Sequence, residues 1–186
     1  MSGLLFALLA TLLAGIGARD QLTVAGIAAR AGQRPGLLMV AVLISVATAS
    51  AAAYGGALLA PLMPNGDARL ILASLALALA GGEMLILKAR PMPDEPTQSL
   101  GAIAIVLAAH QLTDAVRFLI VAIAVATRAP FSAGLGGALG GACVVLAGWL
   151  GAQALPVRQL SLIRRGVGAM LLLVAGYVAL KALGRA

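Results

Sequence analysis

Six apolar runs, each close to the length that a helix needs to cross a bilayer, are the feature that most constrains this fold. They are separated by short stretches that contain proline, glycine or charged residues. The runs cover residues 3–29, 36–63, 70–87, 100–127, 133–155 and 166–183. With 62% hydrophobic and 10% charged residues, the chain has more apolar surface than a soluble domain of its length can bury. We therefore predict an all-α, polytopic membrane protein with six transmembrane helices.

The two halves of the chain resemble each other, which indicates a duplication. Arg19 and Arg30 are separated by the same interval as Arg117 and Arg128. Three helices in each copy would place the copies antiparallel in the membrane, which is the inverted repeat of many transporters. The predicted units are a first three-helix repeat at 1–87, a hydrophilic, proline-rich linker at 88–99 and a second three-helix repeat at 100–186.

Basic residues in the connecting stretches predict the orientation. One side would hold seven of them, namely Arg30, Arg34, Lys88, Arg90, Arg158, Arg164 and Arg165, and the other side would hold four, namely Arg69, Arg128, Lys181 and Arg185. Because cytoplasmic loops are enriched in Lys and Arg, the first side should be cytoplasmic. We expect a multi-pass protein of the bacterial inner (cytoplasmic) membrane. Its partners would be the lipid bilayer and a small ion or solute, and a homodimer is left open.

Several ionisable residues lie inside the apolar runs, where charged groups are costly and usually mark an ion path. On a continuous helix, His110, Asp114 and Arg117 would share one face of the fourth run. We expect Asp114 to pair with Arg117, and Asp20 with its neighbour Arg19, because buried charges need partners. The candidate residues of the ion path are Arg19, Asp20, Glu83, His110, Asp114 and Arg117.

His110 has two interpretations. A hydrogen-bonded interior histidine is one, because a lone histidine is not a transition-metal site. A proton relay with Asp114 is the other, because histidine titrates near neutral pH. The sequence leaves any metal ligands unknown.

Two stretches of the chain resemble a motif of a known family. Residues 15–23 read G-I-G-A-R-D-Q-L-T, and residues 113–118 read T-D-A-V-R-F. Both are similar to E-x-G-D-[KR]-[ST], which opens each three-helix repeat of the Gdt-type proteins, the Golgi and bacterial Ca²⁺/Mn²⁺:proton exchangers of the lysine-exporter superfamily. The basic position is kept as Arg19 and Arg117. The acidic positions hold Gly15, Ala18, Thr113 and Val116.

The resemblance covers essentially the whole chain in architecture. It implies two inverted three-helix repeats and secondary transport, with Mn²⁺ or Ca²⁺ exchanged for protons, or another proton-coupled small ion, passing through a polar site at mid-membrane. Two alternatives stay open: a non-transporting structural or assembly protein that kept the fold and lost the site, and an exporter of an anion or small solute, which two mid-span arginines would suit.

Other classes of function are not expected. The sequence has no phosphate-binding glycine loop, no Cys or His cluster with metal-ligand spacing and no nucleophile elbow, so we expect neither an enzyme nor a cofactor. The net charge of +7 does not predict a nucleic-acid partner, since the basic residues punctuate apolar runs and only 3% of residues are aromatic.

Overall fold

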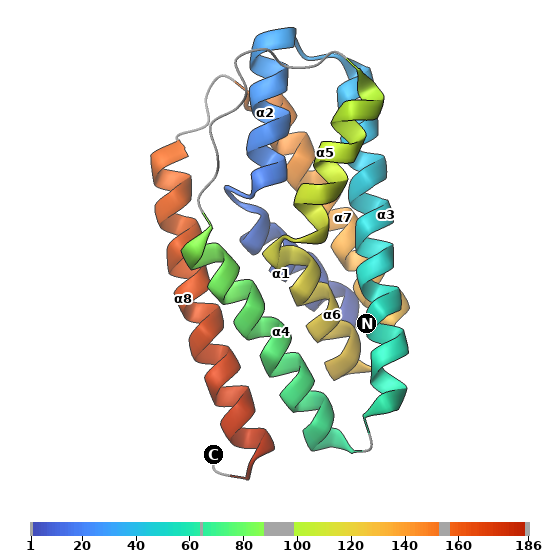
Figure 1. Cartoon of the computed structure of the whole chain (residues 1–186), viewed down its shortest axis with the longest axis vertical. Helices are drawn as coiled ribbons and strands as arrows, with labels where there is room; N and C mark the ends of the chain where they lie inside the picture. Colours follow the sequence, from blue (N-terminus) through green and yellow to red (C-terminus); the bar gives the residue numbers. More distant parts are fainter. Residues whose placement is uncertain (1, 64, 88–98, 153–156, 185–186) are drawn as a thin grey trace.

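The computed structural model describes residues 2–63, 65–87, 99–152 and 157–184, which form helices and contain no strand (Figure 1). The elements are α1 (Ser2–Gly15), α2 (Arg19–Ala31), α3 (Pro35–Leu59), the short 3₁₀ helix η1 (Ala60–Leu62), α4 (Gly66–Ile86), α5 (Leu100–Leu112), α6 (Ala115–Thr127), α7 (Pro130–Leu150) and α8 (Val157–Ala182). The predicted all-α class is confirmed.

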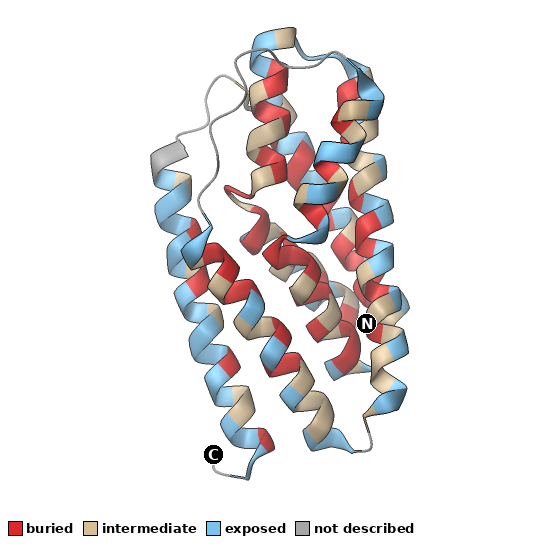
Figure 2. Ribbon diagram, in the orientation of Figure 1, coloured by how far each residue is buried: buried red, intermediate tan, exposed pale blue. Residues whose placement is uncertain are grey.

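Between four and six segments of the described chain can cross a membrane. Four helical segments, α3 with η1, α4, α7 and α8, are long and apolar enough to do so alone. The pairs α1–α2 and α5–α6 qualify only when each bent pair is counted as one span. Figure 2 shows buried residues on the inward helix faces, while leucines such as Leu9 and Leu173 are exposed on the outside, as expected for a lipid-facing surface.

The two bent pairs correct the sequence prediction of a continuous helix through residues 109–117. Helix α5 ends at Leu112 and α6 begins at Ala115, with a bend of 54° between them. His110 therefore belongs to a different helix from Arg117, and the predicted shared face of His110, Asp114 and Arg117 does not exist. The first predicted span is broken in the same way, with a bend of 57° between α1 and α2.

Each break has a local cause. Gly17 has φ +70°, a left-handed conformation that glycine adopts without the steric cost that a side chain brings. At the second break, Asp114 is the N-cap of α6, and its Oδ1 accepts a hydrogen bond from the backbone N–H of Val116 at 3.1 Å. The extended backbone of Asp114 (φ −87°, ψ 148°) leaves the helical path of α5 before α6 begins.

Each half of the chain contains the same order of elements, a bent pair followed by two long helices. This order is what a duplication would produce, and the inverted repeat stays a prediction. The proposed boundaries at residues 87 and 100 also stay predictions, because residues 88–98 of the linker lie outside the described residues.

Helix α8 begins earlier than the sequence predicted. The stretch from Pro156 to Arg165 was expected to be a turn, but α8 starts at Val157, and Arg164 is buried inside the bundle. Arg164 therefore does not belong to the loop charges. The remaining basic residues still favour the same side of the membrane, six against four.

Glycines on α7 allow close helix packing, as their G-x-x-x-G spacing indicates. Gly136 faces α1, where an added Cβ would overlap the carbonyl oxygen of Leu4 and lie 3.0 Å from the Cβ of Ala7. Gly141 faces α3, where an added Cβ would overlap the Ser45 hydroxyl. Helix α7 therefore fills the space between α1 and α3 because it lacks side chains there.

This packing predicts the effect of adding one methyl group to α7. Gly136→Ala should lower the thermal stability of the purified protein, because overpacking costs about 1–3 kcal/mol. Gly55→Ala in α3 is the matched control, since a Cβ there meets nothing within 4 Å. Melting curves in detergent would compare the two variants. Equal stability of both would contradict the close contact between α1 and α7.

Candidate functional site

The two helix breaks lie next to each other inside the bundle, and Figure 1 shows both bends near its mid-height. One side chain connects them directly. Arg19, the first residue of α2, donates from Nη2 to the backbone oxygen and to Oγ1 of Thr113, each at 3.1 Å. Thr113 follows the last residue of α5. The site therefore contains the end of one broken helix and the start of the other.

Four charged side chains form what we call the Glu83 cluster: Arg19, Glu83, Asp114 and Arg164. Arg164 Nη2 lies 2.6 Å from Glu83 Oε2 and 3.5 Å from Asp114 Oδ2. Arg19 Nη2 lies 3.4 Å from Glu83 Oε1. Arg164 Nη1 also donates to the carbonyl oxygen of Ala14, in the last turn of α1, at 3.0 Å. The cluster thus joins α1, α2, α4, α8 and the start of α6.

Beside it lies what we call the Gln111 cluster: Ser45, Thr48, Asp20, Gln111 and Arg117. Gln111 Nε2 donates to Asp20 Oδ2 at 2.9 Å, and Gln111 Oε1 accepts from Arg117 Nη2 at 2.7 Å. Arg117 also donates to Thr48 Oγ1, at 2.6 Å from Nη2 and 3.0 Å from Nε. The fully buried amide of Gln111 therefore bridges an acid and an arginine that do not touch each other.

The two clusters together balance their charges. They hold the arginines Arg19, Arg117 and Arg164 and the acids Asp20, Glu83 and Asp114. Without Arg164, the charged residues recognised in the sequence would be two arginines and three acids. Arg164 is the third arginine, and with it the two clusters have no net charge when all three acids are ionised. This neutrality matters because unpaired charge is costly inside a membrane.

The expected ion pairs were wrong. Asp114 lies against Arg164, while Arg117 has no carboxylate within 4.0 Å among the residues that the structure describes. Asp20 and Arg19 are adjacent in sequence but belong to different clusters. Asp114 and Arg117 both still lie in the first turn of α6, but Asp114 is its N-cap with an extended backbone (φ −87°, ψ 148°). The side chain of Asp114 accepts from Val116 N–H and lies against Arg164 instead.

His110 lies at the margin of the site. It is half-buried, and its Nδ1 is 3.4 Å from Thr23 Oγ1 in α2. Its role as a proton relay stays a prediction. Within the described part of the chain, no group of three or more His, Cys, Asp or Glu residues is arranged to hold a metal ion.

Arg164 is the functional residue that sequence reasoning missed. The chain did contain a signal for it: among residues 159–182 of α8, the buried ones are Arg164, Gly168, Ala175 and Ala182, at spacings of four, seven and seven. The small residues mark the face of α8 that packs on α4, where an added Cβ on Gly168 would lie 3.0 Å from the carbonyl oxygen of Gly81. An arginine on that face should point inward.

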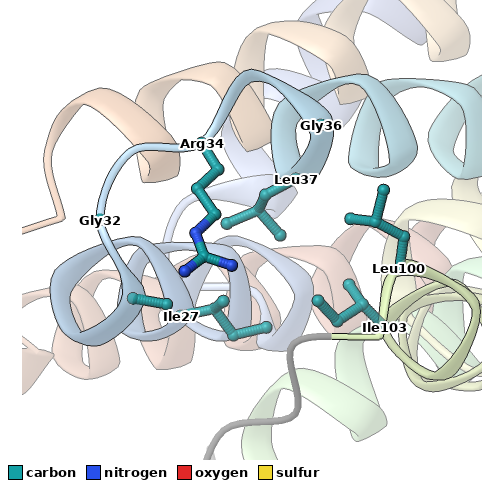
Figure 3. Close-up of a pocket in the computed structure, with 8 residues that line it drawn as sticks. Ile27, Gly32, Arg34, Gly36, Leu37, Leu100 and Ile103 are labelled. Atoms are coloured by element: carbon teal, nitrogen blue, oxygen red, sulfur yellow. The ribbon is translucent and has the colours of Figure 1, made fainter.

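A cavity of about 310 Å³ lies away from both clusters, where α2 ends and α3 and α5 begin (Figure 3). Its lining residues are Ile27, Ala31, Gly32, Arg34, Gly36, Leu37, Leu100 and Ile103. The residues that line the cavity are mostly apolar, and none of them is a candidate site residue. The candidate site is therefore the pair of clusters at the helix breaks.

The geometry predicts strong coupling between Arg164 and Glu83. Arg164→Leu should destabilise the protein by about 3–5 kcal/mol, because it leaves buried acids without their counter-ion. The double variant Arg164→Leu with Glu83→Gln should recover part of that loss. Arg165→Leu is the matched control, because the neighbouring Arg165 is exposed. Thermal or denaturant unfolding in detergent would compare these three variants with Glu83→Gln alone and with the wild type. Additive losses from the two changes would contradict the pair.

No family model, no curated protein and no solved structure matches this chain. Its function is therefore inferred from the geometry of the two clusters and from the resemblance of its two short motifs.

Proposed function

We propose that this chain is a membrane secondary transporter, distantly related to the Gdt-type exchangers, that moves a small ion in a proton-coupled cycle through the Glu83 and Gln111 clusters. The observation that carries the proposal is the meeting of two helix breaks around three buried acids and three arginines. Discontinuous helices that meet near mid-membrane are the usual setting of substrate and ion sites in transporters.

Burying these charged side chains costs free energy, and this cost supports a functional role for the clusters over a purely structural one. Buried ion pairs are often no more stabilising than apolar side chains of the same size. Several polar atoms are also buried with no hydrogen-bond partner among the described residues, including Arg19 Nε, Glu83 Oε1 and Asp114 Oδ2. A network that served only to hold helices together would be expected to satisfy these atoms.

The resemblance implies a divalent cation as cargo, but the local packing does not favour one. The family's first acidic position holds Gly15, where an added Cβ would overlap the side chain of Val144. Ala18 and Val116, at the aspartate positions, are buried in apolar form. Calcium and manganese need several oxygen ligands that carry negative charge. The proposal therefore keeps the proton coupling and does not adopt Mn²⁺ or Ca²⁺ as cargo.

The positions of the residues in and beside the Glu83 cluster indicate the role that each would have in transport. Glu83 and Asp114 share Arg164, so loss of charge on either acid would loosen the contact of α8 with the helix breaks. Arg19 and Thr113 lie at the outer edge of the Glu83 cluster, where a solute would first meet it. The alternative of a non-transporting assembly protein predicts that these charges only stabilise the fold.

Transport assays separate the two functions. Purified protein in liposomes that contain a pH-sensitive dye should move protons when a gradient of at least one small ion is applied from a panel of sodium, potassium, manganese, chloride and nitrate salts. Glu83→Gln should reduce this coupled proton flux to the level of empty liposomes. Asp67→Asn, at an exposed acid of the same helix, should retain it. Wild-type protein that moves no protons under any gradient would favour the non-transporting alternative.

A further inference from the structure

We propose that the ion that accompanies the proton is a small monovalent anion, with Arg19 as its binding group and Glu83 as the proton carrier. This inference rests on the proposed function, because it names the cargo of the same proton-coupled site. It comes from the charge balance of the two clusters and from the position of Arg19 within them.

Arg19 is the most accessible and least committed arginine of the Glu83 cluster. Its side chain is 20% exposed, whereas those of Glu83 and Arg164 are each 6% exposed. Its Nη2 contacts Thr113, which is itself exposed, and its Nε has no hydrogen-bond partner among the described residues. The side chain is thus partly exposed, and its buried Nε has a hydrogen bond left to donate, which makes this guanidinium a suitable group to receive an anion.

Glu83 has an oxygen without a hydrogen bond, and it is the more exposed of the two acids of its cluster. Its Oε2 is held by Arg164 at 2.6 Å, while its Oε1 faces Arg19 at 3.4 Å without a hydrogen bond. The charged groups that face it are Arg19 from α2, Asp114 at the start of α6 and Arg164 from α8. Glu83 Oε1 is therefore the carboxylate oxygen that lies next to the partly exposed side chain of Arg19.

The other two acids are less available. Both oxygens of Asp20 accept hydrogen bonds, from the backbone N–H of Gln21 at 2.8 Å and from Gln111 at 2.9 Å. Asp114 uses Oδ1 to cap α6, and its side chain is only 2% exposed. A proton on Asp20 would replace one of these hydrogen bonds, whereas Asp114 Oδ2, which lies 3.5 Å from Arg164, has no hydrogen bond to lose but is less exposed than Glu83.

Charge balance then selects the sign of the cargo. With all three acids ionised, the clusters are neutral as they stand. A proton on Glu83 Oε1 removes one negative charge and releases Arg19 from its ion pair. A monovalent anion that pairs with Arg19 restores neutrality, and its departure with the proton returns the Arg19–Glu83 pair. One proton and one anion would thus move together, with no net charge left in the interior.

A cation does not fit the same scheme. Each acid already has an arginine near it, so a bound sodium ion would leave one excess positive charge and a manganese ion would leave two. Either excess would be buried in a low-dielectric environment, which is costly. A cation carrier would need an acid that has no arginine partner.

An ion-substitution experiment on wild-type proteoliposomes tests the sign directly. Chloride or nitrate is replaced by gluconate at constant sodium, and in parallel sodium is replaced by potassium or manganese at constant anion. Proton movement should follow the chloride or nitrate gradient in the same direction and should not respond to the cation. Proton movement that follows a cation gradient would overturn the inference and leave the proposed function intact. No proton movement with any ion would overturn both.

Binding in detergent provides the residue-level test. Nitrate, compared with gluconate at the same ionic strength, should raise the melting temperature of wild-type protein, and its apparent affinity should fall by up to about tenfold per pH unit as Glu83 loses its proton. Glu83→Gln mimics the protonated acid, so its nitrate affinity should no longer depend on pH. Arg19→Gln should lose the nitrate effect, while the exposed control Arg165→Gln should keep it. A wild-type nitrate effect that is absent or independent of pH would overturn the proton–anion linkage even if a variant fails to fold.

Discussion

The need for a neutral interior is the constraint on which this structure depends. Glu83 and Asp114 are buried among helices that are apolar enough to cross a membrane, and both are held by Arg164 of α8, at 2.6 and 3.5 Å. An isolated charge inside a membrane costs several kcal/mol of free energy. Removing any one of these three residues would therefore leave an unpaired charge on the others. The same contacts attach the α4–α8 pair to the rest of the bundle, so fold and site share one set of interactions.

The broken helices impose a second constraint, because backbone groups freed at a break need partners inside a membrane. The side chains of the site provide several of them. Arg164 donates to the carbonyl oxygen of Ala14, and Arg19 donates to that of Thr113. The side-chain oxygen of Gln21 accepts from the backbone N–H of Gly17 at 2.8 Å. The arginines therefore neutralise acids and complete the backbone at once, which explains why charge gathers at the breaks.

The sequence was sufficient to predict the all-α class and apolar helices long enough to cross a membrane, and it named five of the six charged residues that the structure brings together in the two clusters. It was not sufficient to predict the break between α5 and α6, because the polar stretch from His110 to Asp114 lies inside a longer apolar run, and such residues occur in continuous helices as well as at breaks. The expected pairing of Asp114 with Arg117 failed because Asp114 is the N-cap of α6, where its side chain accepts from Val116 N–H and lies against Arg164. Arg164 was missed because a stretch that contains a proline and two adjacent arginines is typical of a loop. Only the spacing of Arg164 from the buried small residues of α8 indicates that its side chain lies inside the bundle. The inverted repeat, the orientation and the transported ion stay predictions.

The voltage dependence of proton flux in proteoliposomes tests the claim of a neutral site most directly. A cycle that moves one net charge would gain or lose about 2.3 kcal/mol of driving force for each 100 mV of membrane potential. If the Glu83 and Gln111 clusters stay neutral in every state, proton flux driven by a chloride gradient should be the same with the potential clamped at zero and at about 100 mV. A flux that changes its rate or direction with the clamped potential would contradict the claim.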